Sequence, residues 1–137
     1  MILLISHWVC SLAMTLIIWF VQLVHYPAFK WGDKETFPQF MLDHQRRISV
    51  IVLPFMLGEL LTMLVLMKQN QSSWVWAAAA LLAVIWVSTF ALQVPCHRSL
   101  TEGYNVEIIN RLVLSNWIRT GAWSVKLAVV TVGLWWG

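Results

Sequence analysis

The chain has 137 residues, of which 60% are hydrophobic and only 11% are charged. Soluble domains are about 45–50% apolar and about 25% charged, so this composition excludes an ordinary water-soluble domain and a disordered segment. The net charge of +3, from nine basic and six acidic residues, is too small to indicate a nucleic-acid partner. Two cysteines are too few for a disulfide framework.

Four apolar runs follow one another along the chain, and each is long enough for a membrane helix, which needs about 20 apolar residues. They predict helices at about 2–25, 45–67, 74–95 and 106–136. We therefore expect one all-α domain, residues 1–137, folded as an antiparallel up-down-up-down four-helix bundle in the bilayer. The first run is expected to be a retained helix rather than a signal peptide, because it lacks a basic leader and a small-residue cleavage site.

Prolines predict where two of these helices end, since a residue before proline is disfavoured in the helical region. The segment His25-Tyr26-Pro27 is expected to close the first helix, and Val94-Pro95 the third. A short interfacial helix is expected to begin at Thr36-Phe37-Pro38 and to lead into the second long helix.

The basic residues predict the orientation. Segments 25–47 and 96–111 hold six of them, whereas Lys68 is alone on the other side. The positive-inside rule places the more basic side in the cytoplasm. We therefore expect an integral protein of a bacterial inner membrane, with both termini non-cytoplasmic. The six residues are Lys30, Lys34, Arg46, Arg47, Arg98 and Arg111.

Each predicted helix carries one polar stripe. Polar groups in lipid normally face the bundle interior, and residues three or four apart share a helix face. Depth along the helices brings part of these stripes to one level near the cytoplasmic boundary, which predicts a polar pocket that opens toward the cytoplasm. The residues of this level are Gln22, His25, His44, Arg47, Gln93, His97, Asn116 and Arg119.

Two kinds of chemistry fit such a pocket. In the first, His25, His44 and His97 bind a haem or a mononuclear metal ion, since histidines from different helices can ligate either. In the second no cofactor is present, and the polar groups bind an anionic or phenolic amphiphile and stabilise an enolate-like charge, with a histidine as base. The candidate catalytic residues are Arg119, Asn116, Arg47 and Glu59.

Glu59 and Lys126 lie deep in the second and fourth runs, near the expected centre of the membrane. Two hypotheses apply to them: an internal ion pair that fixes the packing, or a carboxyl group that takes part in function. His7 is expected at the opposite interface, away from the pocket.

The last predicted helix contains Asn110-Arg111-Leu112 and then Asn116-Trp117-Ile118-Arg119-Thr120, and Gln93-Val94-Pro95 ends the third. With these segments the chain resembles the small four-helix membrane proteins grouped with the anthrone oxygenases. The resemblance implies oxygen-dependent oxidation of a polycyclic, phenol-like substrate without an established cofactor. Asn116 and Arg119 are the positions to which it extends.

Three classes of function follow. The first is a membrane oxidoreductase or oxygenase that binds a haem, a metal or an amphiphilic aromatic substrate. The second is an accessory subunit of a larger membrane complex, and the third is a small proton-coupled transporter that uses Glu59. The expected partners are the lipid bilayer and a hydrophobic small molecule, together with copies of the chain or the subunits of a larger complex.

Overall fold

The computed structural model describes residues 1–136 and shows an all-helical chain built from four long helical stretches. Gly137, the last residue of the predicted domain, lies outside the described residues. The helical elements are α1 (Ile2–Phe20), η1 (Val21–His25), α2 (Tyr26–Ala28), η2 (Phe29–Trp31), α3 (Phe37–Gln69), α4 (Ser73–Ser88), η3 (Thr89–Gln93), α5 (Val94–Leu100) and α6 (Val106–Trp136).

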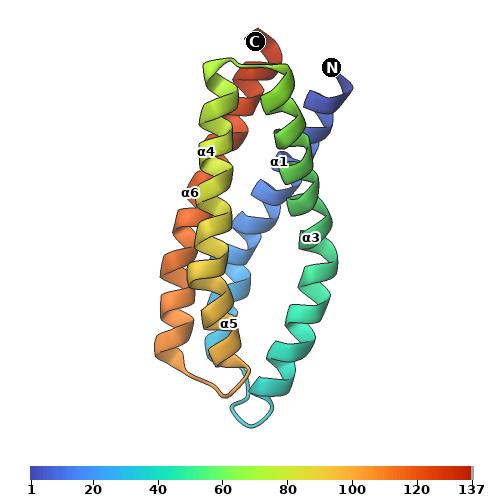
Figure 1. The fold of residues 1–137 in the computed structure, drawn as a ribbon. Coiled ribbons are helices and arrows are strands. Elements are labelled where there is room, and N and C mark those ends of the chain that lie inside the picture. The colour runs from blue at the N-terminus through green and yellow to red at the C-terminus, as the bar shows by residue number, and fades with distance from the viewer. Residues whose placement is uncertain (137) are drawn as a thin grey trace.

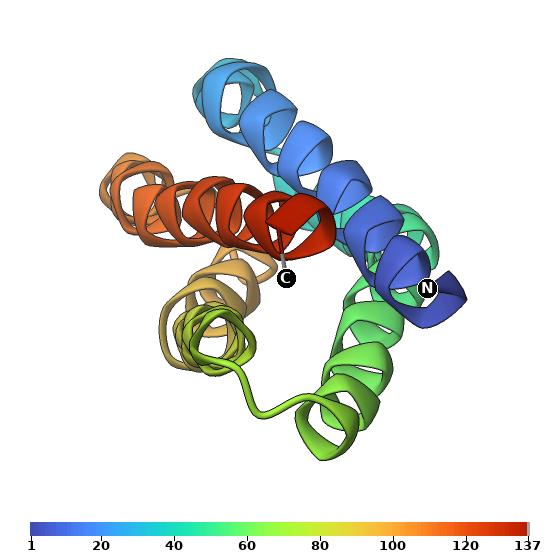
Figure 2. The same cartoon turned by 90° about the horizontal axis from the view of Figure 1, so that it is seen from above.

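The four stretches lie side by side. Both termini and the α3–α4 turn are at one end of the molecule, and the connections 32–36 and 101–105 are at the other (Figure 1). Seen from above, α6 lies between α1 and α4 and packs against both, whereas α3 packs mainly on α1 (Figure 2). Fewer contacts join α3 to α4, so the bundle is less tightly packed between these two helices.

Three stretches, Ile2–Trp31, Phe37–Gln69 and Ser73–Leu100, are long and apolar enough to cross a membrane. Among the described residues α6 does not reach that apolarity, although the sequence predicts four spanning helices. The difference has a physical reason, because α6 carries Arg119 and Lys126 within its length, and both side chains are buried in the bundle.

The prediction that prolines close the first and third helices is wrong. A π-helical turn, Val21–His25, precedes Pro27, and the helix continues to Trp31. A second π turn, Thr89–Gln93, precedes Pro95 in the same way. A π turn uses i→i+5 hydrogen bonds, so each helix already departs from the α pattern where the proline ring would collide with the carbonyl four residues earlier.

The second long helix also begins earlier than predicted. The structure has no separate interfacial helix before it, since α3 runs without interruption for 33 residues from Phe37 to Gln69 and continues through Pro54. At about 1.5 Å per residue it is about 50 Å long, which exceeds the roughly 30 Å hydrocarbon core of a bilayer. The first turns of α3 therefore extend beyond the most apolar part of the helix and bring His44 to the end of the bundle opposite the termini.

Candidate functional site

A cavity of about 220 Å³ lies between α1, α3 and the α4–α5 stretch, with one wall residue on α6. Most of its lining is apolar, from side chains such as Met14, Val52 and Phe90. The polar lining residues are His25, Tyr26, His44, Ser49, Thr89, Gln93, His97 and Arg119. The cavity therefore combines an apolar interior with a group of proton-carrying side chains.

The structure brings together the three histidines that the sequence places at one level. Nε2 of His25 lies 3.0 Å from Nδ1 of His44, and the rings of His44 and His97 are stacked with their centroids 6.0 Å apart. Tyr26 joins them, because its hydroxyl lies 3.0 Å from Nε2 of His97. Tyr26 directly follows the first π turn, and the consecutive residues His25 and Tyr26 both line the cavity.

The histidines do not form the predicted metal site. Within residues 1–136, no three His, Cys, Asp or Glu side chains are arranged to hold a metal ion together. His25 and His44 use one ring nitrogen each to contact the other, and His97 uses Nε2 to contact Tyr26. Three of the six ring nitrogens are therefore used in hydrogen-bonded contacts rather than directed at one common point.

Arg119 is the most unusual group in the cavity wall. Its side chain is only 6% exposed, and within the described residues the two ion pairs are Arg47–Asp43 and Lys126–Glu59, which leaves Arg119 without a carboxylate. Its Nη1 donates to Oδ1 of Asn116 at 3.4 Å, while its Nε is buried and has no partner. A buried charge is costly unless it is paired and hydrogen-bonded, so the guanidinium is suited to an anion that enters the cavity.

Asn116 is held in a defined orientation. Its Nδ2 donates to Oε1 of Gln22 at 2.9 Å, and the hydroxyl of Thr120 donates to the same oxygen at 3.1 Å. Nε2 of Gln22 in turn donates to the carbonyl of Val113 at 3.0 Å. Because the Asn116 amide is fixed through Nδ2, its oxygen is directed toward Arg119.

His97 supplies a second unsatisfied group. Its Nδ1 is buried and has no hydrogen-bond partner in the part of the chain that the structure describes. Buried polar atoms are nearly always bonded, and His97 and Arg119 both line the same cavity. Trp86, which lines the cavity as well, has a buried Nε1 without a partner, so three lining residues carry an unsatisfied nitrogen.

Arg47 is not part of this site, contrary to the prediction from the sequence. Its side chain is 80% exposed and its Nε donates to Oδ2 of Asp43 at 2.8 Å. Three residues rotate the helix by about 300°, so Arg47 is turned by about 60° from His44. The long side chain then reaches outward to the acidic residue one turn earlier, the usual i,i+4 pairing of exposed helix residues.

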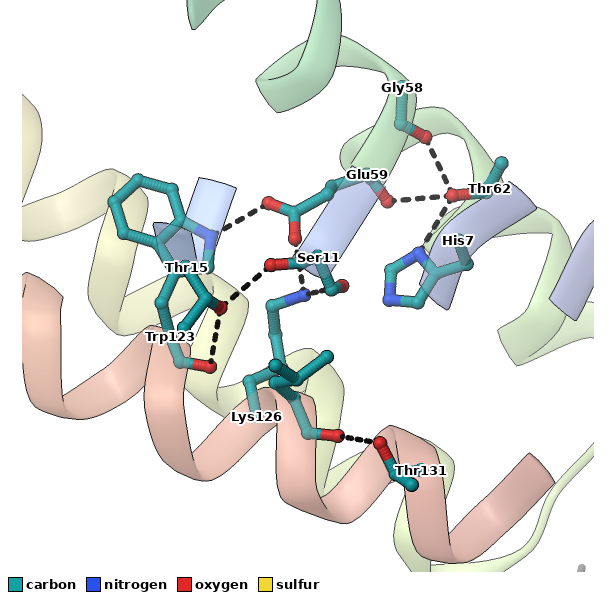
Figure 3. A network of polar contacts seen from close by, with 10 residues as sticks. His7, Ser11, Thr15, Gly58, Glu59, Thr62, Trp123, Lys126 and Thr131 are labelled. Carbon is teal, nitrogen blue, oxygen red and sulfur yellow. Dashed lines mark hydrogen bonds and ion pairs between the residues drawn. The ribbon is translucent and has the colours of Figure 1, made fainter. Parts of the chain in front are cut away.

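Glu59 is also outside the cavity lining, and it belongs to a second, enclosed polar cluster (Figure 3). Its Oε1 accepts from Nζ of Lys126 at 2.6 Å, and its Oε2 accepts from Nε1 of Trp123 at 2.9 Å. Lys126 also donates to the hydroxyl of Ser11 at 2.5 Å. All four side chains are fully buried. The structure thus confirms the hypothesis of an internal ion pair.

His7 lies next to this cluster and is not among the residues that line the cavity. The ring is fully buried, with Nδ1 2.7 Å from the hydroxyl of Thr62 (Figure 3). The packing of α1 against α3 encloses it. Its expected depth at the opposite interface stays a prediction.

Two further hollows adjoin the cavity. A polar one shares His97 with it and is lined also by Gln45, Arg98 and Thr101. An apolar one shares His25 with it and is lined otherwise by aliphatic and aromatic residues of α1 and α3. His97 therefore lies between the cavity and the more polar hollow, and His25 lies between the cavity and the apolar one.

No family model, curated protein or solved structure matches this chain. The sequence pointed to His25, His44, His97, Asn116 and Arg119, but gave no reason to prefer a proton donor over an interface anchor for Tyr26. The signal in the sequence is that Tyr26 lies between His25 and Pro27. In the structure this tyrosine directly follows the π turn Val21–His25 and lines the cavity.

Proposed function

We propose that the protein is a small membrane-embedded oxidoreductase of the oxygenase type, which binds an amphiphilic aromatic molecule in the bundle cavity through an anionic oxygen. The observation that supports it most is the buried Arg119 guanidinium, which has no carboxylate partner and lines an otherwise apolar cavity. The cavity, at about 220 Å³, is smaller than the roughly 300–1,000 Å³ of typical ligand pockets. A compact ring system suits it better than a long chain.

The membrane setting of this proposal is an antiparallel bundle of four spanning helices in a bacterial inner membrane. Three helices have the length and apolarity for it, and the two charges inside α6 are turned into the bundle. The basic residues of the connecting segments favour a cytoplasmic position for the cavity end and a non-cytoplasmic position for both termini. A reporter inserted at Asn70 should respond as non-cytoplasmic and one at Asp33 as cytoplasmic, and the reverse pattern would contradict this orientation.

The chemistry that we propose begins with proton transfer. In the tautomer in which Nε2–H of His97 donates to the Tyr26 oxygen, Nδ1 is free to accept a proton from the enol or phenol group of the substrate. The resulting oxyanion is stabilised by Arg119, whose planar guanidinium donates two hydrogen bonds to one anionic group. Asn116 holds the guanidinium in place.

The electron-rich anion then reacts with molecular oxygen, as the resemblance to the anthrone oxygenases implies. With anthrone as substrate, the ring CH₂ group becomes a carbonyl. One oxygen atom of O₂ enters that carbonyl, and the other leaves as water with the two hydrogens that the carbon loses. The products are one anthraquinone and one water for each O₂ consumed.

The test uses the purified full-length protein in detergent, with anthrone and an oxygen electrode. We expect catalysed uptake of one O₂ for each anthraquinone, and a loss of about 100-fold in Arg119→Lys, because lysine keeps the charge but lacks the planar fork. Arg47→Lys is the matched control, since Arg47 is exposed on the same bundle and should leave the rate unchanged. No rate above the spontaneous reaction, or equal rates in the two variants, would overturn the proposal.

The transporter hypothesis is not favoured. A carboxyl group that exchanges protons must be free to cycle between its charged and neutral forms, whereas Glu59 is enclosed, paired with Lys126 and bonded to Trp123. The accessory-subunit hypothesis has no specific observation in its favour.

A further inference from the structure

We infer that Trp123, anchored by Glu59, is a positioning residue that fixes the Arg119 guanidinium toward the cavity. The inference rests on the proposed function, in which Arg119 binds the anionic oxygen of the substrate. In this inference the Glu59–Lys126 pair has a role other than stability, because Glu59 accepts the hydrogen bond that orients the Trp123 indole.

Arg119 is held from both sides along its own helix. Asn116, one turn before it, accepts a hydrogen bond from Nη1, and Trp123, one turn after it, places its ring 5.2 Å from the guanidinium carbon. A guanidinium this close to an indole is attracted by the electrons of the ring. The two neighbours therefore fix where the guanidinium lies.

Each neighbour is in turn anchored to a different helix of the bundle. The Asn116 amide is bonded to Gln22 in the π turn after α1, and the Trp123 indole is bonded to Glu59 on α3. The position of Arg119 thus depends on contacts with two helices that also line the cavity. Removing either anchor frees a side chain that restrains the guanidinium.

The two oxygens of the Glu59 carboxylate accept from different donors, and this supports the role. One oxygen is used by Lys126, which balances the charge, and the other is used by the indole N–H, which fixes direction (Figure 3). Replacing a buried ion pair with apolar residues of similar volume is often neutral or stabilising. A buried ion pair is therefore weak evidence for a stabilising role, whereas an oriented Trp123 requires an acceptor at this position.

The experiment separates the hydrogen bond from the ion pair with two double variants of the full chain. Glu59→Leu with Lys126→Met removes both charges and the acceptor, and Glu59→Gln with Lys126→Met removes both charges but keeps an acceptor oxygen for the indole. The probes are 1-naphthol and naphthalene, which differ by one hydroxyl. The measured quantity is the ratio of their affinities, because a general loss of packing changes both affinities together.

We expect the preference for 1-naphthol to fall about tenfold in the leucine–methionine variant, the effect of losing one well-placed hydrogen bond. Trp123→Phe, which keeps a ring face but lacks the N–H, should fall by a similar factor. The glutamine–methionine variant should keep the wild-type ratio. Unfolding temperatures confirm that each variant is folded.

The outcomes distinguish the two ideas. If the wild type shows no preference for 1-naphthol, the proposed function fails and the positioning role fails with it. If the wild type shows the preference and Arg119→Leu abolishes it, but the leucine–methionine variant keeps it, the positioning role alone is overturned. A glutamine–methionine variant that loses as much as the leucine–methionine variant also overturns it, since the hydrogen bond would then not be the cause.

Discussion

Two buried cations, Arg119 and Lys126, lie on the same face of α6, but their surroundings differ. Lys126 meets a carboxylate, and its ammonium also donates to Ser11. Arg119, seven residues earlier and two turns away, forms no ion pair with a carboxylate, and it contacts an amide oxygen and the face of an indole. The first charge is balanced inside the protein and the second is not. A charge that the fold leaves unbalanced beside a cavity is better explained by a ligand than by packing.

The largest effect is expected from breaking the balanced charge. Glu59→Leu alone leaves a buried ammonium, and Lys126→Met alone leaves a buried carboxylate, so each should lower the free energy of unfolding by about 3–5 kcal/mol. The double variant should be milder than either. Denaturant unfolding in detergent measures all three, and additive losses in the double variant would show that the two side chains are not coupled.

Removing the unbalanced charge of Arg119 should not lower the free energy of unfolding. Arg119→Leu removes a buried guanidinium that has no anion, so we expect the free energy of unfolding to stay the same or to rise by about 1–2 kcal/mol. Binding of 1-naphthol should be lost in the same protein. Unfolding and binding measured on one preparation test this contrast, which would be refuted if the variant were destabilised as strongly as the Lys126 variant.

Changing His25 or His44 to alanine should lower the free energy of unfolding by a smaller amount, and the two effects should be coupled. Because His25 and His44 share one hydrogen bond, each change to alanine should remove the same contact and cost about 1 kcal/mol for it. The double variant should then cost less than the sum of the two single changes. A double-mutant cycle on unfolding gives the coupling directly, and a coupling of zero would show that the two rings do not interact.

The smallest effect is expected at the exposed arginine. Arg47→Gln breaks a surface ion pair with Asp43, and such pairs contribute about 0–1 kcal/mol. Stability and 1-naphthol binding should both stay near wild type. A strong loss of binding in this variant would return Arg47 to the site, and would mean that its side chain turns inward when a ligand is bound.

The resemblance to the anthrone oxygenases stays a prediction, whereas the placement of the residues that suggested it can be examined directly. Asn116 and Arg119 are hydrogen-bonded neighbours, and Arg119 lines the cavity. Helical spacing made this foreseeable, because residues three apart share a face. The same rule gave a wrong prediction for Arg47, which was expected to share the cavity face of the helix with His44. One helix face is broad, and the long Arg47 side chain turns outward to Asp43.

Composition and periodicity alone determined the all-helical class and the polar interior, and placed Glu59 and Lys126 at a similar depth, because polar groups in an apolar chain normally face the bundle interior. The pairing of the two side chains itself came from the structure. The tertiary structure decided the rest. The path of each helix past its proline depends on a π turn, the burial of His7 depends on how α1 meets α3, and the isolation of Arg119 depends on which carboxylates come within reach. These are relations between helices, and the pattern within one helix does not contain them.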